Sequence, residues 1–412
     1  MAGVTTFLTM SYILAVNPDI LSAASMDRGA VFTATALAAS SATLIMAILA
    51  KLPFALAPGM GLNAFFAFTL VQGMGYSWES ALAAVFIEGV IFILLTVFNI
   101  RELIVNAIPE TLRHAISVGI GLFIAFLGLQ KAGLIVADPV TFVALGEFTP
   151  STLLAMGGIV IGGVLVARKV KGALFYAIVA VTLLSIPLGI TQLPEDFSLV
   201  SKPHSLEPVF FKLDFHSLLS PNMLIAIFSL VFMDIFDTLG TLVGTANKVG
   251  MVRPDGSIPK LKPAMMADAV GTTVGALLGT STTTTYAEST AGIAEGGRSG
   301  LTAAVVSGLF IVALFFAPFF LLVPGIATAG VLVIVGSFMF DAVKKIRFDD
   351  ITEAFPAFVT IITMPLTYSI AEGIVLGILA YVLLKLLTGK YRELNLTICI
   401  LSVLCILKYV FV

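Results

Sequence analysis

Three carboxylates lie within apolar segments of this chain, where ionisable side chains are rare. Asp234 and Asp237 occur in the run SLVFMDIFDTLGTL, and Glu288 follows a run of threonines in TSTTTTYAESTAGIAEGG. A carboxylate at membrane depth costs roughly 2.5–3.5 kcal/mol on insertion scales, so its presence there is typical of a functional site. We predict that these side chains bind a polar substrate or exchange protons, with structural hydrogen bonding as the alternative role.

The spacing of the carboxylates suggests different roles for them. Asp234 and Asp237 are three residues apart and share one helical face, so two ionised groups in one dry pocket are unfavourable. Glu288 lies where a short helix is expected to begin. Burial favours its protonated form, whereas the helix dipole favours its ionised form. Such a balance suits a proton carrier, and we select Glu288 and Asp237 for proton coupling, with Asp234 as an alternative.

Two short segments near these carboxylates interrupt the helical pattern. In APGMGLNAFFAF (57–68), Pro58, Gly59 and Gly61 disfavour a continuous helix. In the second segment, the β-branched run 282–285 favours extended backbone. Extended backbone inside a bilayer needs hydrogen-bond partners, so we expect the two stretches to face each other. Two kinked helices without a site are the alternative.

A short helix should follow each extended stretch and point its positive end at a common centre. We expect Asn63 to cap the first helix, and the second helix to span residues 286–294. The Asn63 amide offers a donor and acceptors, and Phe65 or Phe66 offers a ring for stacking, with core packing as the alternative for the rings. The predicted substrate-binding residues are Asn63, Phe65, Phe66, Asp234, Asp237, Thr285 and Glu288.

The framework that positions these residues must be an all-α polytopic membrane protein. Of the 412 residues, 59% are hydrophobic and 11% are charged, whereas soluble domains have roughly 25% charged residues. Mean hydropathy is +1.09, and a spanning helix needs about 20 mostly apolar residues. We predict fourteen spans, at 4–24, 29–50, 53–73, 78–98, 110–133, 152–168, 172–190, 219–246, 264–280, 281–297, 300–322, 326–344, 352–368 and 370–388. The apolar stretch 395–411 is a further span or an interfacial helix.

The charges give these spans an orientation. With a cytoplasmic N-terminus, seventeen Lys and Arg residues lie near the inner connections, among them Arg101 and Arg253. The outer side has only Arg28, Lys131, Lys202 and Lys212. The positive-inside rule therefore favours a cytoplasmic N-terminus. The first stretch is too long for a signal-peptide core, and we expect a short polar leader before it.

The remaining composition excludes several classes of protein. A net charge of −2 excludes a polybasic nucleic-acid binder. The two cysteines and the three scattered histidines predict neither a disulfide framework nor a metal site. Among other acidic residues, we expect Glu88 to hydrogen-bond within the bundle and Asp268 to lie near a helix start. We expect Asp349 and Asp350, with Glu353, to cap the helix after the basic turn 344–347.

The chain also repeats itself, which predicts its domain organisation. The run 80–98 resembles 300–319, and 32–50 resembles 264–282, although chance similarity between apolar helices is the alternative. Seven spans per half would invert the halves relative to each other, and matched broken segments are typical of a midplane substrate site. The expected parts are a first inverted repeat (1–190), an external linker (191–218), a second repeat (219–390) and a C-terminal hydrophobic segment (391–412).

Several strings resemble the AzgA-like adenine/guanine/hypoxanthine permeases of the nucleobase–cation symporter family. They are GVTTFLTMSYI, APGMGLNAFFAF, FMDIFDTLGTL, GTSTTTTYAESTAGIAEGGRSGLTA and PLTYSIAEGI, and the similarity covers nearly the whole chain. The resemblance implies a uracil permease-like fold, with spans 1–4 and 8–11 in a core domain and spans 5–7 and 12–14 in a gate domain. At the site it implies Asn63, an aspartate of the eighth span and Glu288, with Asp237 favoured because it precedes Gly240.

The resemblance also implies a function. It implies proton-coupled uptake of purine nucleobases by an elevator-like movement of core against gate, in a homodimer in the cytoplasmic (inner) membrane of a bacterium. The sequence does not choose among hypoxanthine, guanine and adenine, and no cofactor beyond the coupled proton is expected.

Three other functions compete with this one. An anion carrier would use the two helix N-termini, but Asp237 and Glu288 would repel an anion, and residues 52–100 and 263–297 contain no Lys or Arg. A channel would use the carboxylates to line a cation pore. An enzyme is disfavoured, because the chain has no zinc-protease motif, nucleophile elbow or phosphate loop.

Overall fold

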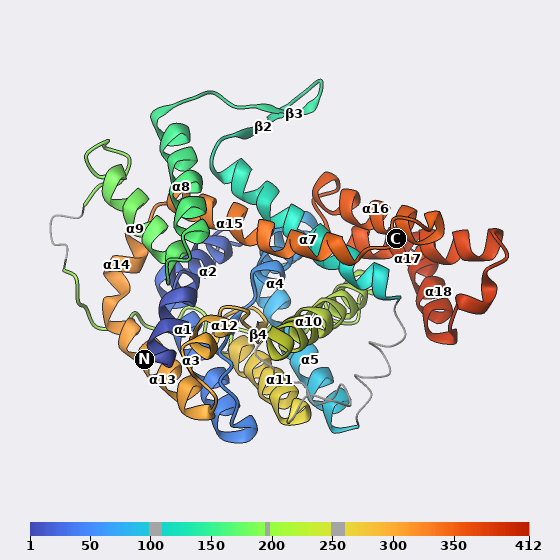
Figure 1. Ribbon diagram of the computed structural model, residues 1–412, viewed down its shortest axis with the longest axis horizontal. Helices are drawn as coiled ribbons and strands as arrows, with labels where there is room; N and C mark the ends of the chain where they lie inside the picture. Colours follow the sequence, from blue (N-terminus) through green and yellow to red (C-terminus); the bar gives the residue numbers. More distant parts are fainter. Residues whose placement is uncertain (99–108, 194–197, 249–259, 412) are drawn as a thin grey trace.

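The computed structural model describes residues 1–98, 109–193, 198–248 and 260–411 as a helical molecule with two short two-stranded sheets (Figure 1). Seven helices within these ranges are long and apolar enough to cross a membrane, and shorter apolar helices accompany them. The chain is therefore a multi-pass membrane protein. The count of fourteen spans stays a prediction, and the connections that contain Arg101 and Arg253 lie outside the described residues.

The helices pack in two groups. The first group contains α1 (Ala2–Met10), α2 (Ile13–Ser22), α3 (Arg28–Ile45), η1 (Met46–Ala50), α4 (Met60–Ala64), η2 (Phe65–Gly73), α5 (Trp78–Val97), α10 (Pro221–Lys248), α11 (Leu261–Leu278), α12 (Ser289–Ala294), α13 (Gly300–Ala313), η3 (Leu314–Phe316) and α14 (Ala317–Leu321). The second group contains α7 (Glu110–Lys131), α8 (Pro150–Ala167), α9 (Ala173–Ser185), α15 (Gly325–Phe340), η4 (Asp341–Lys345), α16 (Ile351–Leu366) and α17 (Ile370–Leu387).

Within the first group, each of the repeated segments packs on a segment from the other half of the chain, but not on the one that it resembles. Helix α5 packs on α11, and α13 packs on α3. The strands β1 (Leu56–Pro58) and β4 (Thr283–Thr285) form a third pair between the two halves of the chain. The halves are therefore interlocked around the strands, and Figure 1 shows α1 of the first half beside α12 and α13 of the second.

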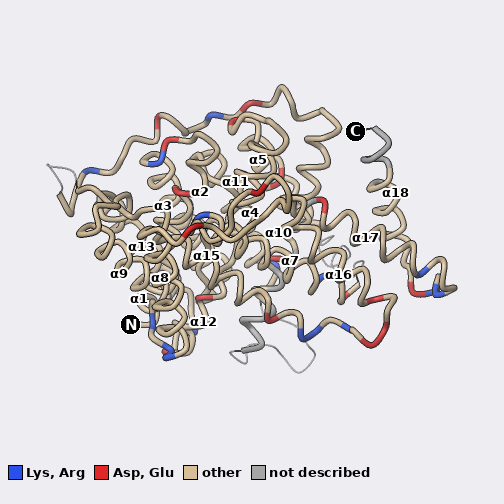
Figure 2. The backbone as a smooth tube through the Cα atoms, turned by 90° about the horizontal axis from the view of Figure 1, so that it is seen from above, with Lys and Arg blue, Asp and Glu red and all other residues tan. Residues whose placement is uncertain are grey.

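Short side chains cap the helices at the ends of the spans. Asp27 accepts a hydrogen bond from the amide of Ala30 (2.7 Å) at the start of α3. Asp350 accepts one from the amide of Thr352 (2.9 Å) at the start of α16, which confirms the cap predicted there. Most charged segments lie along the upper and lower edges of the molecule in Figure 2, and the helices between them are largely uncharged.

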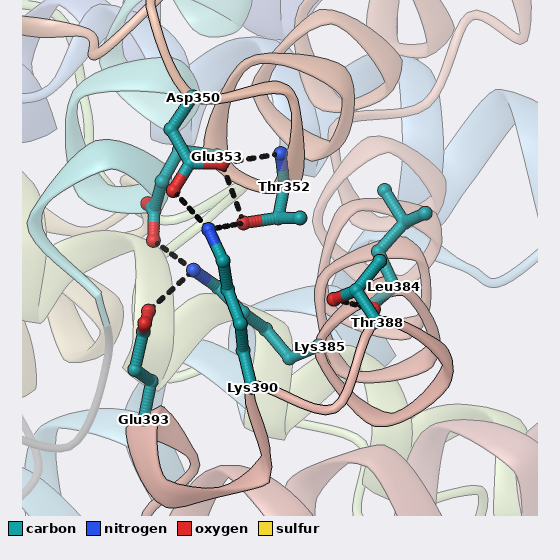
Figure 3. Close-up of polar contacts among 8 residues, drawn as sticks. All are labelled: Asp350, Thr352, Glu353, Leu384, Lys385, Thr388, Lys390 and Glu393. Carbon is teal, nitrogen blue, oxygen red and sulfur yellow. Dashed lines mark hydrogen bonds and ion pairs between the residues drawn. The ribbon is translucent and has the colours of Figure 1, made fainter.

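The end of the chain is held to the second group by a cluster of charges (Figure 3). Lys385 of α17 is fully buried, and its Nζ atom lies 2.8 Å from Glu353 and 2.5 Å from Glu393 of η5 (Tyr391–Glu393). Beside it, Lys390 donates to Asp350 at 2.7 Å. This cluster fixes the turn that leads to α18 (Leu396–Phe411), which packs on α17 and α10.

One element was not predicted. Residues 132–149, between α7 and α8, include the antiparallel strands β2 (Ile135–Asp138) and β3 (Phe142–Leu145), which form a hairpin. The sequence predicts the linker 191–218 as the long polar connection and gives no prediction of strands in residues 132–149.

Candidate substrate site

Two short strands form the centre of the first helix group. Strand β1 pairs with β4 antiparallel, with Leu56 opposite Thr285 and Pro58 opposite Thr283. The predicted pairing of two extended stretches is therefore confirmed. The first stretch is shorter than expected, because α4 begins at Met60 and includes Gly61.

Hydroxyl groups from the surrounding helices satisfy the remaining backbone groups of the strands. Thr43 of α3 accepts from the amide of Leu56 (2.9 Å) and donates to its carbonyl (3.0 Å). Thr272 of α11 donates to the carbonyl of Thr283 (3.0 Å). Unpaired backbone is costly in a bilayer, so these threonines allow strands to exist at this depth.

A cavity of about 130 Å³, here called the substrate cavity, lies where the strands give way to short helices. From the first helix group it is lined by Tyr12, Gly59, Met60, Gly61, Leu62, Met233, Asp237, Thr241, Thr284, Thr285, Tyr286, Ala287 and Glu288. From the second group it is lined by Ile120, Val335, Phe338 and Met339. The cavity therefore lies between the two groups.

Glu288 enters the cavity just before α12. Tyr12, located at the break between α1 and α2, donates to Glu288 Oε1 at 2.6 Å. Helix α12 is pressed against α1, because a Cβ added at Gly292 would lie 2.5 Å from the carbonyl oxygen of Ala2. This contact fixes the position of Glu288 relative to Tyr12.

Asp237 reaches the same cavity from α10. Its carboxylate is hydrogen-bonded to the side chain of Thr284 on β4. A Cβ at Gly59 would lie 2.7 Å from Thr284 Cγ2 and 3.5 Å from Asp237 Oδ2, so a larger residue would crowd this corner. Asp237 and Glu288 are both partly exposed, whereas Thr285, which also lines the cavity, is 2% exposed. Within the described residues, the buried Thr285 hydroxyl has no hydrogen-bond partner.

Four predicted site residues do not line the cavity. Asn63 is fully buried inside α4 instead of capping it, because Gly59 takes the cap position, and its Oδ1 accepts from Ser281 at 2.5 Å. Phe65 and Phe66 are fully buried in the core, as the alternative interpretation held. Asp234 is fully buried and accepts from Thr238 at 3.0 Å.

The structure adds a polar network behind the cavity. Thr238 also lies 3.0 Å from Asp268, which is in the middle of α11, so the expectation of a helix start was wrong. Glu88 accepts from Thr282 at 2.6 Å, in line with the bundle hydrogen bond expected for it. These contacts anchor α5, α10 and α11 to the β4 segment.

Tyr12 and Tyr286 are the functional candidates that the sequence analysis missed. Their rings lie 6.4 Å apart, and Tyr286 donates to the carbonyl of Pro58 at 2.6 Å. Both residues occur in the strings that carry the family resemblance, and a phenol in a span usually needs a polar partner. The need for such a partner is the signal by which the sequence could have identified these two tyrosines.

The cavity is suited to a small, neutral ligand with N–H donors. Its lining includes two carboxylates and several hydroxyl-bearing residues, and none of the lining residues is Lys, Arg or His. A carboxylate accepts from N–H groups, and a hydrogen bond to a charged group contributes about 1.5–3 kcal/mol. An anion would meet two carboxylates without a compensating cation among the lining residues.

Known proteins match the chain along its length. Residues 1–376 match the Permease family. A permease of Methanocaldococcus jannaschii is 50% identical over 100% of this chain and 94% of that protein. The adenine permease AdeP of Escherichia coli is 42% identical over 100% of this chain and 92% of its own length. The guanine/hypoxanthine permease PbuG of Bacillus subtilis is 42% identical, with 99% and 95% covered.

Solved structures show the same fold. The transmembrane domain of the cyanobacterial bicarbonate transporter BicA superposes with a TM-score of 0.68 over 90% of this chain and 95% of that domain, at 18% identity. At this identity the likeness concerns the fold alone. The family match and the relatives are permeases, so the chain is a transporter and not an enzyme. The motif resemblance is thereby confirmed, and the chain belongs to the permease family, among the adenine and guanine/hypoxanthine permeases.

Proposed function

We propose that this chain couples the uptake of a purine nucleobase to protons. The observation that carries the proposal is that Asp237 and Glu288, from two different elements, face one small cavity between the two helix groups. A purine is flat and neutral and has N–H donors beside lone-pair acceptors. The carboxylates accept from its N–H groups, and a hydroxyl group of the cavity lining donates to an acceptor on its edge.

A neutral base gains nothing from the membrane potential, so its accumulation requires a coupled ion. A carboxylate that changes protonation during the cycle provides that coupling without a cofactor. Glu288 is the first choice for this role, because it lines the cavity and its hydrogen bond from Tyr12 connects it to the break between α1 and α2. Asp237 is the second choice. The named relatives that are adenine and guanine/hypoxanthine permeases support a purine as the substrate.

The proposed cycle moves the first helix group against the second. The cavity is formed by both groups, so a relative displacement would open it to one side of the membrane and then to the other. The N-terminus is cytoplasmic in this proposal, in accord with the charge bias of the connections. We further propose a homodimer in the cytoplasmic membrane.

An anion carrier is the second candidate, because the fold is shared with a bicarbonate transporter. The two carboxylates and the absence of Lys, Arg and His from the cavity lining disfavour it.

The test is uptake of radiolabelled adenine, guanine and hypoxanthine in cells that lack their own purine permeases. We expect saturable uptake that a protonophore abolishes and that Glu288→Gln or Asp237→Asn reduces at least about tenfold, as loss of one charged hydrogen bond implies. Glu207→Gln, at an exposed site in the linker, is the matched control and should leave uptake unchanged. Well-expressed protein that takes up no purine would overturn the substrate assignment, and uptake that does not saturate would indicate a channel.

A further inference from the structure

A second, larger cavity adjoins the substrate cavity. Its volume is about 400 Å³, and Met60 lines both cavities. It extends to the ends of α2 and α7, where Asp19, Gln130 and Lys131 lie, and to Tyr368 in the turn between α16 and α17. The predicted topology places this end outside the cell. We call it the outer cavity, and a solute that enters from outside would reach it before the substrate cavity.

The wall of the outer cavity contains an aromatic cluster held in a fixed position. The Tyr368 ring meets the rings of Phe68 (5.9 Å), Phe123 (5.5 Å) and Phe126 (6.3 Å), all nearly edge-on. The Tyr368 backbone has φ of +55°, in the left-handed region that is rare for a bulky residue. Such strain persists only where surrounding structure enforces it and is concentrated at functional sites.

The polar side of this cavity suits a neutral ligand. Lys131 and Asp19 form an ion pair with each other, so neither is an uncompensated charge. Gln130 is different, because its side chain is neutral and half-buried in the lining of this cavity, and its amide can both donate and accept. A glutamine amide matches the adjacent donor and acceptor on the edge of adenine with two hydrogen bonds. Aromatic walls with a few polar groups, and a volume within about 300–1,000 Å³, are typical of ligand sites.

We propose that the outer cavity is a second, weaker binding station for the purine base. The base would lie against Tyr368 and Phe68 with its polar edge on Gln130, and would then pass Met60 into the substrate cavity. The station rests on the proposed function, since the same solute occupies both sites. Its affinity is lower, because one neutral amide replaces the two carboxylates.

The test separates the two sites by protection of a cysteine. Cys399 and Cys405 are first replaced by serine, and Ala23→Cys is introduced in the lining of the outer cavity. Asp237→Asn and Glu288→Gln disable the substrate cavity in this protein. We expect millimolar adenine or hypoxanthine to slow labelling of the Ala23→Cys protein by a water-soluble thiol reagent about fivefold. The added change Gln130→Leu should remove the protection.

Val140→Cys is the matched control, because Val140 is 82% exposed in the β2–β3 hairpin and lines neither cavity, and it should show no protection. The proposal would be overturned if the base does not slow labelling in the protein that carries Asp237→Asn and Glu288→Gln. It would also be overturned if protection persists after Gln130→Leu is added.

A transport measurement supplies a second readout that does not need the multiple variant. Gln130→Leu alone should raise KM for the base about fivefold with little change in Vmax, because the station loads the substrate cavity. An unchanged KM would contradict the second station. Uptake by the wild type distinguishes the two proposals. If the wild-type protein transports purines but shows neither the cysteine protection nor the change in KM, only the outer station fails. If the wild-type protein takes up no purine, the proposed function fails.

Discussion

The hydrogen bond between Tyr12 and Glu288 is the most specific feature of the site at the scale of single residues. The Tyr12 hydroxyl lies 2.6 Å from Glu288 Oε1, and Tyr12 is 1% exposed. Two segments far apart in the sequence therefore meet at the proposed proton carrier. The bond orients the carboxylate toward the cavity and supplies one of its donors.

Tyr12→Phe should lower transport without disrupting the fold. The variant keeps the ring and removes the donor, and hydrogen bonds to charged groups contribute about 1.5–3 kcal/mol. We expect KM for the purine, measured by initial uptake rates, to rise about tenfold. Tyr176→Phe is the control, because Tyr176 is 44% exposed on α9. Equal kinetics for Tyr12→Phe and the wild type would contradict the role of this bond.

Part of the site could be predicted from local sequence, and part could not. Pro58 and the threonine run 282–285 specify extended backbone by their own chemistry, so the paired strands were predictable. Asn63 and the adjacent phenylalanines were misplaced because a short helix has several faces. The face that meets the cavity depends on where the helix begins, which is Met60 here, and on packing against distant helices.

At the scale of elements, close contact between α7 and α15 forms the centre of the second helix group. A Cβ at Gly336 would lie 2.3 Å from the carbonyl oxygen of Gly121, and a Cβ at Gly121 would lie 2.6 Å from that of Gly336. Small residues permit this approach, as is common between helices in membranes.

Gly336→Ala should therefore destabilise the protein. Overpacking costs about 1–3 kcal/mol, because the two helices must move apart. Gly163→Ala in α8 should not be destabilising, since a Cβ there meets nothing within 4 Å and alanine has the higher helix propensity. Thermal unfolding in detergent measures both. A Gly336→Ala protein as stable as Gly163→Ala would show that the helices are not in this contact.

The charge cluster in Figure 3 predicts a dependence of stability on pH. The hydrogen bond from Lys390 holds the pKa of Asp350 well below its ordinary value, and the hydrogen bond from Lys385 lowers the pKa of Glu393. Groups with a lowered folded-state pKa stabilise the fold above their unfolded pKa, about 4, and this contribution is lost as pH falls through the folded-state values.

Lys390→Gln should thus lower the unfolding temperature at pH 7 and have a smaller effect near pH 3. The outer carboxylate Asp138 is a useful control, because its lowered pKa comes from hydrogen bonds with residues 140 and 141 and not from a lysine. Asp138→Asn should leave the effect of Lys390→Gln unchanged. An effect of Lys390→Gln that is the same at both pH values would argue against the ion pair as its cause.

At the scale of the whole molecule, one cluster joins the two helix groups at the outer end. Asp19 of α2 forms an ion pair with Lys131 of α7 and accepts from Thr328 of α15 at 2.8 Å. Arg28 lies 3.9 Å from Asp19 and donates to the carbonyls of Leu321 and Val323. These contacts hold the two helix groups in their observed relative position, and a displacement of one group against the other would break them.

Asp19→Asn and Lys131→Gln should each favour the alternative arrangement of the groups. We expect faster thiol labelling of Ala64→Cys, which is 1% exposed in the lining of the outer cavity. The double variant should label no faster than Asp19→Asn alone, because that change already removes the ion-pair partner of Lys131. Additive effects of the two changes would show that the residues act separately.

The most direct test of proton-coupled purine transport is acidification of liposomes. Purified protein is reconstituted with a pH-sensitive dye inside, and adenine, guanine or hypoxanthine is added outside without a pH gradient. We predict that a transported base acidifies the interior at a rate proportional to its uptake, and that Glu288→Gln abolishes this signal. Purine uptake by the wild type without internal acidification, or full acidification by Glu288→Gln, would contradict the account.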